Sequence, residues 1–186
     1  MSAAPVMVIG ATGILRPACL DLVGAGRPVL AIARDGQRLG DLRRAAGPLL
    51  APKSADCRVL ASVGVALTGA EGLGPLSGAL VYCPAAPAHL LDVVTRATRG
   101  PVVWLMTSAG AAAQGSNAQL PASDGESHAR APGGVVTVKL GWATELDGSP
   151  RWHTPREVST IALEALHQNM DRTLGTWDPG RLPLGL

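Results

Sequence analysis

Aromatic side chains and cysteines are scarce in this 186-residue chain. It contains no phenylalanine, one tyrosine and four tryptophans, so its core has to be built from aliphatic side chains and alanine. A catalytic scheme that needs a tyrosine has Tyr82 as its one candidate. The three cysteines, Cys19, Cys57 and Cys83, are odd in number and widely spaced, which argues against a disulfide scaffold and against a zinc site.

A strong charge imbalance and a long apolar run are absent as well. Sixteen lysines and arginines nearly balance 14 aspartates and glutamates, and the net charge of +2 gives no reason to expect a nucleic acid or an anionic membrane as partner. No window reaches the roughly 18 uncharged apolar residues of a membrane span, and no basic segment precedes the first apolar run. We therefore expect a cytoplasmic protein, and the length predicts one domain over residues 1–186.

Short apolar runs alternate with helical patterns along most of the chain. The runs predict strands over residues 6–9, 29–33, 58–60, 79–83, 101–106 and 135–140, with an edge strand over 172–177. Helices are predicted over residues 14–25, from the capping residue Asp35 to residue 46, over 90–98, and from the capping box of Thr154 and Glu157 to about Asn169. Successive β-α units imply right-handed crossovers, so the predicted fold class is a Rossmann-like α/β/α fold with a doubly wound parallel sheet.

Two segments interrupt this alternation. Residues 48–55 are predicted to be a loop. Residues 111–134 are rich in Ala, Gly, Ser, Asn and Pro and carry no apolar stripe of helical length, so a flexible loop is predicted there as well.

A tight turn joins the first predicted strand to the first predicted helix. Such a turn brings backbone N–H groups close to a diphosphate, and the positive end of the helix favours its charge. Arg16 takes the place of the third glycine of the usual fingerprint. We predict that this turn binds a dinucleotide; the alternative is a Rossmann scaffold without a ligand. The turn residues are Gly10, Ala11, Thr12, Gly13 and Ile14.

Arg34 follows the second predicted strand, where an acidic side chain would bind the adenosine ribose of NAD(H). An arginine there favours the 2′-phosphate of NADP(H), and Arg38, one helical turn later, is placed to share that phosphate. The sequence therefore predicts NADP(H) as the cofactor. The alternative is that both arginines are solvated side chains without a ligand.

Four motifs follow one another in the chain: Gly10-Ala11-Thr12-Gly13, Ala31-Ile32-Ala33-Arg34-Asp35, Leu105-Met106-Thr107-Ser108-Ala109, and Leu146-Asp147-Gly148 followed by Thr154-Pro155-Arg156-Glu157-Val158. In this order, over residues 6–177, they resemble the atypical short-chain dehydrogenase/reductases, especially the small NAD(P)H-binding group that includes flavin and biliverdin reductases. The resemblance implies a diphosphate over residues 12–14 and a 2′-phosphate near Arg34. It also implies a nicotinamide pocket lined by Cys83, Pro84, Thr107 and Ser108.

The chain also departs from this family. Leu60-Ala61-Ser62 stands where the family has an acidic residue after the third strand, and no tyrosine follows Ser108 to form a Tyr-x-x-x-Lys pair. Lys139-Leu140 replaces a frequent Arg-Pro, and Trp142 replaces the histidine of the small reductases. The segment after the fifth strand is too short for the long helix that usually covers the active site. The pocket is therefore open, or it is closed by a second subunit of a homo-oligomer or by another partner.

Few side chains are available for acid–base chemistry. Ser108 is placed to hydrogen-bond the nicotinamide amide or a substrate carbonyl, and Lys139 to stabilise developing negative charge, although both are equally explained as polar residues at strand ends. Trp142 is predicted to stack on the substrate or else to be a core residue. His128 and His153 are weaker candidates for a general acid. Cys83 is expected to be a small buried apolar residue rather than a nucleophile.

These patterns favour an NADP(H)-dependent reductase that transfers a hydride to a small planar or polycyclic organic substrate, with solvent supplying the proton and no metal involved. Two alternatives stay open. One is a non-catalytic dinucleotide-binding sensor or partner-binding protein. The other is a non-redox biosynthetic enzyme, such as an isomerase, cyclase or lyase, on the same scaffold.

Overall fold

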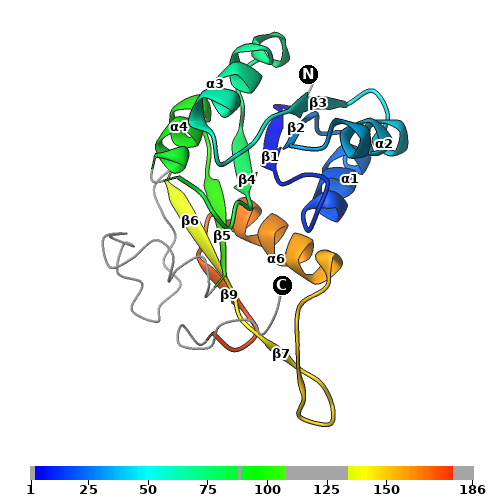
Figure 1. Cartoon of the computed structure of the whole chain (residues 1–186), viewed down its shortest axis with the longest axis vertical. Helices are drawn as coiled ribbons and strands as arrows, with labels where there is room; N and C mark the ends of the chain where they lie inside the picture. The colour runs from blue at the N-terminus through cyan, green and yellow to red at the C-terminus, as the bar shows by residue number, and fades with distance from the viewer. Residues whose placement is uncertain (1–2, 88, 108–133, 178–186) are drawn as a thin grey trace.

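A parallel sheet forms the centre of the molecule (Figure 1). The computed structural model describes residues 3–87, 89–107 and 134–177. Within them, seven strands pair in the order β3-β2-β1-β4-β5-β6-β9, each parallel to its neighbours. The predicted Rossmann-like α/β fold is therefore confirmed. The strands are β1 Val6–Ile9, β2 Val29–Ala33, β3 Leu50–Ser54, β4 Gly78–Val81, β5 Val102–Thr107, β6 Val135–Leu140 and β9 Arg172–Leu174.

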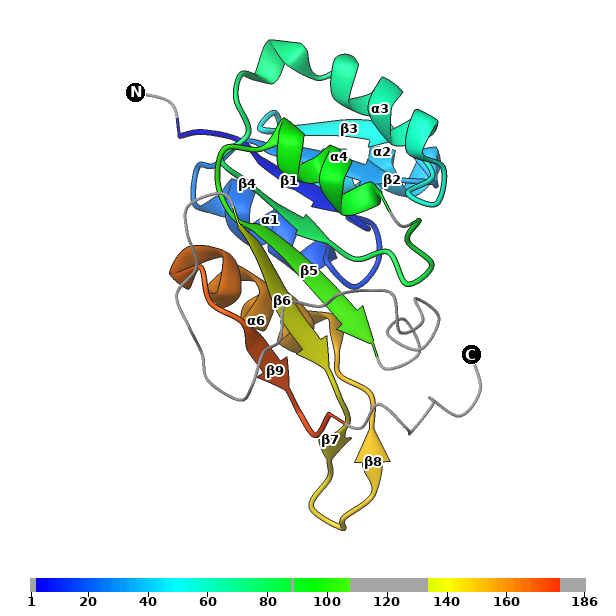
Figure 2. The same ribbon diagram turned by 90° about the vertical axis from the view of Figure 1, so that its left-hand side faces the viewer.

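Helices cover both faces of this sheet (Figure 2). One layer consists of α1 (Arg16–Gly24), α2 (Gly36–Ala46) and α6 (Pro155–Gln168), and the other of α3 (Leu60–Thr68) and α4 (Leu90–Ala97), with a short 3-10 helix, Glu71–Leu73, after α3. Because side chains alternate along a strand, Val6 and Val8 join the first core, whereas Met7 and Ile9 join the second. No helix among the described residues is long and apolar enough to cross a membrane.

The order of the strands places a crevice at a defined point of the sheet. β2 and β3 extend the sheet on one side of β1, and β4, β5 and β6 extend it on the other. The winding therefore reverses between β1 and β4. In open α/β sheets, ligands bind outside the carboxyl ends of the strands at such a reversal.

The third strand differs from the prediction. β3 is Leu50–Ser54, inside the predicted loop, and the predicted strand over residues 58–60 is wrong, because that stretch leads into α3. The strand was not predicted because Pro52 and Lys53 interrupt the apolar run. An edge strand tolerates both, since it pairs on one side only, with β2, and Pro52 is exposed. Asp56, and not Leu60-Ala61-Ser62, therefore follows the third strand.

The other predicted elements lie close to their predicted bounds. Asp35 caps α2, where its Oδ1 accepts the Arg38 backbone N–H at 3.0 Å, and Thr154 and Glu157 form the predicted capping box of α6. The α1 helix begins at Arg16, two residues later than predicted. A hairpin of β7 (Ala143–Thr144) and β8 (Pro150–Arg151) was not predicted. The loop predicted over residues 111–134 lies, except for Gly134, outside the described residues.

Candidate functional site

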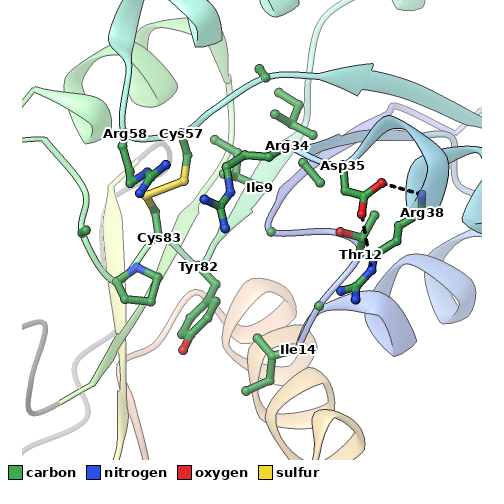
Figure 3. Close-up of a pocket in the computed structure, with 17 residues that line it drawn as sticks. Ile9, Thr12, Ile14, Arg34, Asp35, Arg38, Cys57, Arg58, Tyr82 and Cys83 are labelled. Carbon is green, nitrogen blue, oxygen red and sulfur yellow. Dashed lines mark hydrogen bonds and ion pairs between the residues drawn. A yellow bond between two sulfur atoms is a disulfide. The ribbon is translucent and has the colours of Figure 1, made fainter. Parts of the chain in front are cut away.

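A cavity of about 660 Å³ opens at the carboxyl ends of β1, β2 and β4, at the point where the winding reverses (Figure 3). Its walls come from the turn after β1, the start of α2, and the segments that follow β3 and β4. The lining residues are Ile9, Gly10, Thr12, Gly13, Ile14, Ile32, Ala33, Arg34, Asp35, Arg38, Ala55, Cys57, Arg58, Tyr82, Cys83, Pro84 and Ala85.

The turn after β1 requires glycine at its first position. Gly10 has a φ of 88°, in the left-handed region, and a Cβ there would lie 2.8 Å from the carbonyl oxygen of Tyr82. The Gly10 N–H donates to the Ile32 carbonyl at 2.9 Å, and the Gly13 N–H donates to the Gly10 carbonyl at 3.1 Å. The chain therefore turns back tightly above the ends of β1 and β2.

The same turn contains two backbone N–H groups that make no hydrogen bond among the described residues. Among the hydrogen bonds of the described residues, none is donated by the N–H of Thr12 or of Ile14, and both residues line the cavity. From α6, in the same layer as α1, Ser159 donates to the Ile14 carbonyl at 3.0 Å and holds the turn in place. Backbone donors at the start of α1, together with the positive end of the helix dipole, make this a favourable place for an anion.

Two further residues of the turn have different surroundings. Ala11 is fully buried in the core and does not line the cavity, so only its backbone contributes to the turn. Arg16, which replaces the third fingerprint glycine, is exposed and is also absent from the cavity wall. The departure from the fingerprint therefore leaves the cleft open.

Cationic side chains dominate one end of the cavity. Arg34, at the end of β2, and Arg38, in α2, both line it, as does Arg58, which the sequence interpretation missed. The one carboxylate in the lining, Asp35, is already engaged: its Oδ1 accepts the Arg38 backbone N–H, and its Oδ2 lies 3.5 Å from the Arg38 Nε. The potential at this end is therefore positive, although the net charge of the chain is only +2.

Arg58 is held by Asp56, the acidic residue after β3. Its Nε donates to Asp56 Oδ1 at 3.0 Å and its Nη2 to Asp56 Oδ2 at 2.7 Å, so the pair is bidentate. Hydrogen bonds from Arg58 lower the pKa of Asp56 to about 2, and Asp56 in turn raises the pKa of Arg58. Arg58 therefore stays charged and in place at the wall of the cleft.

A disulfide crosses the same end of the cleft, contrary to the sequence-based expectation. It joins Cys57, after β3, to Cys83, after β4, and their Cα atoms are 6.4 Å apart, a separation usual for bonded cysteines. Cys83 is buried, as expected, but it is bonded rather than free. Sequence spacing could not reveal the pair, because the two residues approach each other only when the sheet forms. Cys19 is separate and fully buried, and burial raises its pKa to about 12.

Tyr82 is a second lining residue that the site prediction missed. It directly follows β4, and its backbone N–H donates to the Ile9 carbonyl at 3.1 Å. Partial burial raises the pKa of its phenol, which therefore stays protonated at neutral pH. Figure 3 shows the ring pointing away from the disulfide, toward the side of the cleft where Ile14 lies.

The described residues among the remaining site predictions do not line this cavity. Ser108 and His128 lie outside the described residues. Thr107 is buried at the end of β5, and Lys139 lies in β6 opposite Met106, but neither lines the cavity. Trp142 also lies off the wall and packs edge to face on Trp152, with ring centroids 5.7 Å apart. His153 is buried, and its Nε2 lies 3.2 Å from the Leu174 carbonyl oxygen, where it supports β9.

Comparison with known proteins identifies solved structures with a similar fold but no protein with a similar sequence. No family model and no curated protein matches the chain. An apo SCOR enzyme from Clostridium thermocellum superposes with a TM-score of 0.67 at 16% identity, over 94% of this chain and 90% of that one. A short-chain dehydrogenase/reductase named glucose/ribitol dehydrogenase from Brucella melitensis superposes with a TM-score of 0.65 at 15% sequence identity, over 95% of this chain and 97% of that one. Apo glucose dehydrogenase of Caenorhabditis elegans has a TM-score of 0.63 at 15% sequence identity, over 94% of this chain and 96% of that one. At such identities the likeness shows a shared fold.

Proposed function

We propose that this chain binds NADP(H) in the cleft and is an NADP(H)-dependent reductase of the atypical short-chain type. One observation carries the proposal: a single cavity is lined both by three arginines and by Thr12 and Ile14, whose backbone N–H groups donate no hydrogen bond among the described residues. Amides at a helix start suit a diphosphate, and arginine suits a phosphate monoester. The two features lie at the positions that a dinucleotide needs in this fold.

Preference for NADP(H) over NAD(H) rests on the charges around β2. A carboxylate that binds the ribose diol of NAD(H) must have free acceptor capacity. Part of the acceptor capacity of Asp35 is used by Arg38, since its Oδ1 accepts the Arg38 backbone N–H and its Oδ2 pairs with the guanidinium, and Arg34 directly follows the strand. The cleft therefore offers guanidinium donors and little free carboxylate to the adenosine ribose.

For the reaction itself, the protein would contribute the orientation of the cofactor and the substrate. The nicotinamide of a bound NADPH would supply the hydride. Pro84 and Ala85, which continue the cavity wall beyond β4, are placed to support that ring. No tyrosine follows Ser108 in the sequence, so we propose that solvent protonates a small planar organic substrate after hydride transfer. Ser108, Lys139 and Trp142 remain proposed contacts of the substrate.

One observation favours a second candidate, a non-catalytic dinucleotide sensor. Lys139 and Trp142, two of the proposed substrate contacts, lie outside the described cavity wall. A sensor needs the nucleotide half of the cleft but not a substrate pocket. Binding without turnover of a flavin or quinone would therefore favour this candidate over the reductase.

The test is a calorimetric titration with NADPH and NADH of the wild-type protein and of Arg34→Glu. Losing a charge-assisted contact and adding a repulsive charge should weaken NADPH binding by about 10- to 100-fold and leave NADH binding nearly unchanged. Arg44→Glu is the matched control, since Arg44 lies in α2, the helix that follows Arg34, and is exposed without lining the cavity. An unchanged ratio of NADPH to NADH affinity in Arg34→Glu would refute the role of Arg34.

A further inference from the structure

The disulfide spans the cleft rather than bracing a remote loop. In the sheet, β2 and β1 lie between β3 and β4, so the segment after β3 crosses the ends of these two strands before Cys57 meets Cys83 after β4, with 6.4 Å between their Cα atoms. Both cysteines line the cavity, together with Arg34 and Arg58 (Figure 3). The bond therefore forms part of the wall of the nucleotide site.

No hydrogen bond among the described residues joins the segment around Cys57 to the segment around Cys83. Within the described part of the chain, the hydrogen bonds of residues 56–59 are all made within residues 56–63: the Asp56 N–H donates to Ser62 Oγ at 3.1 Å, the Val59 N–H to the Asp56 carbonyl at 3.0 Å, and Arg58 to Asp56. None of them reaches the segment after β4. Apart from apolar packing of Cys57 and Leu60 against the core cluster that contains Cys83, the covalent bond therefore holds this segment at the cleft.

The position of Arg58 depends on that segment. Its anchor, Asp56, belongs to the same short stretch and moves with it. When the disulfide is closed, Arg58 is fixed at the wall, and the 660 Å³ cavity exists in this bonded state. Once the bond opens, ordering the segment around a ligand costs conformational entropy that the bonded state does not incur.

From this arrangement we propose that Cys57 and Cys83 form a redox-active site that controls nucleotide binding, with the disulfide as the tight-binding state and the dithiol as the weak-binding state. The proposal rests on the proposed function, since its readout is binding of NADPH. Its reaction partner is a dithiol.

The exchange proceeds by thiolate attack. Cys57 is partly exposed whereas Cys83 is buried, so a thiolate of the dithiol attacks the Cys57 sulfur. The protein S–S bond breaks, and the Cys83 sulfur leaves with the electron pair and takes a proton from solvent. The second thiol of the reductant loses its proton and attacks the mixed disulfide, which releases the Cys57 thiol. In total, two electrons and two protons pass from the dithiol, which becomes a disulfide, to the cysteine pair.

The experiment compares NADPH binding to the air-oxidised protein and to the protein reduced with dithiothreitol, with thiols counted by maleimide labelling and mass spectrometry. Because Cys19 and Cys83 are both buried, labelling is done after unfolding: we expect one labelled thiol, Cys19, in the oxidised protein and three after reduction. Reduction should weaken NADPH binding by about tenfold. A Cys57→Ser/Cys83→Ser double variant should bind like the reduced protein with or without dithiothreitol, whereas Cys19→Ala should keep the wild-type response.

Two results would overturn the proposal: Cys57 and Cys83 labelled in the oxidised protein, or equal NADPH affinity in both states once labelling shows full conversion. A protein that binds no NADPH in either state, while its thiol labelling follows the redox state, would instead refute the proposed function and with it this control of binding. Failure of the redox proposal and failure of the proposed function therefore give different results.

Discussion

At the scale of single residues, the cleft depends on one backbone position that excludes a side chain. Gly10 combines a left-handed φ of 88° with a close approach of the Tyr82 carbonyl, so an alanine there meets both backbone strain and a steric clash. Gly26 has a similar φ of 76°, but no atom lies within 4 Å of its Cβ position. The two glycines separate the effect of strain from that of the clash.

We predict that Gly26→Ala costs about 1–2 kcal/mol of unfolding free energy, the cost of a left-handed backbone. Gly10→Ala should cost more, because its Cβ would also overlap the backbone that follows β4, and it should lose NADPH binding as well. Urea denaturation of both variants measures the difference. A Gly10→Ala protein as stable as Gly26→Ala would show that the turn does not need this close approach.

Residues next to a well-marked strand could be assigned to the cleft from sequence. Gly10, Thr12 and Gly13 follow the apolar run of β1, and Arg34 follows that of β2, so their edge of the sheet was determined by local pattern. Arg58 was missed because its place depends on where β3 ends. For Tyr82 a signal was present: it lies immediately before Cys83, in a predicted strand that in fact ends at Val81.

At the scale of elements, α6 connects several parts of the site. Besides the hydrogen bond from Ser159 to the turn after β1, Arg156 pairs with Asp21 of α1 at 2.8 Å, and Glu157 binds Arg151 of β8 at 2.6 Å. The start of this helix is determined by its capping box, in which the Glu157 N–H donates to Thr154 Oγ1 at 3.2 Å. This local signal made α6 the helix with the clearest start in the sequence.

Thr154→Ala removes one half of that box. We expect a loss of about 1 kcal/mol in unfolding free energy, which corresponds to a decrease of about 2–4 °C in Tm for a protein of this size. Thr160→Ala is the matched control on the same helix, where Thr160 is exposed and bonds only the Arg156 carbonyl, and its effect should stay within about 0.5 kcal/mol. Thermal denaturation compares the two variants. Equal effects would mean that the capping box adds nothing to stability.

At the scale of the whole molecule, the sequence determines the layers better than it determines long-range contacts. Alternating apolar runs and helical patterns predicted the parallel sheet because each β-α unit carries its own periodicity. The bond between Cys57 and Cys83, and the approach of Arg58, after β3, to Arg34 and Arg38, follow only from the order β3-β2-β1-β4. Such contacts have no local signature, so they could not be derived without the fold.

The central claim is that this assembly of turn and arginines holds the diphosphate and 2′-phosphate of one nucleotide. A crystal structure of the oxidised protein grown with saturating NADPH tests it most directly. The account predicts diphosphate oxygens about 2.7–3.2 Å from the backbone nitrogens of Thr12 and Ile14, and the 2′-phosphate against Arg34. An empty cleft at saturating NADPH, or a diphosphate bound away from the turn, would contradict it.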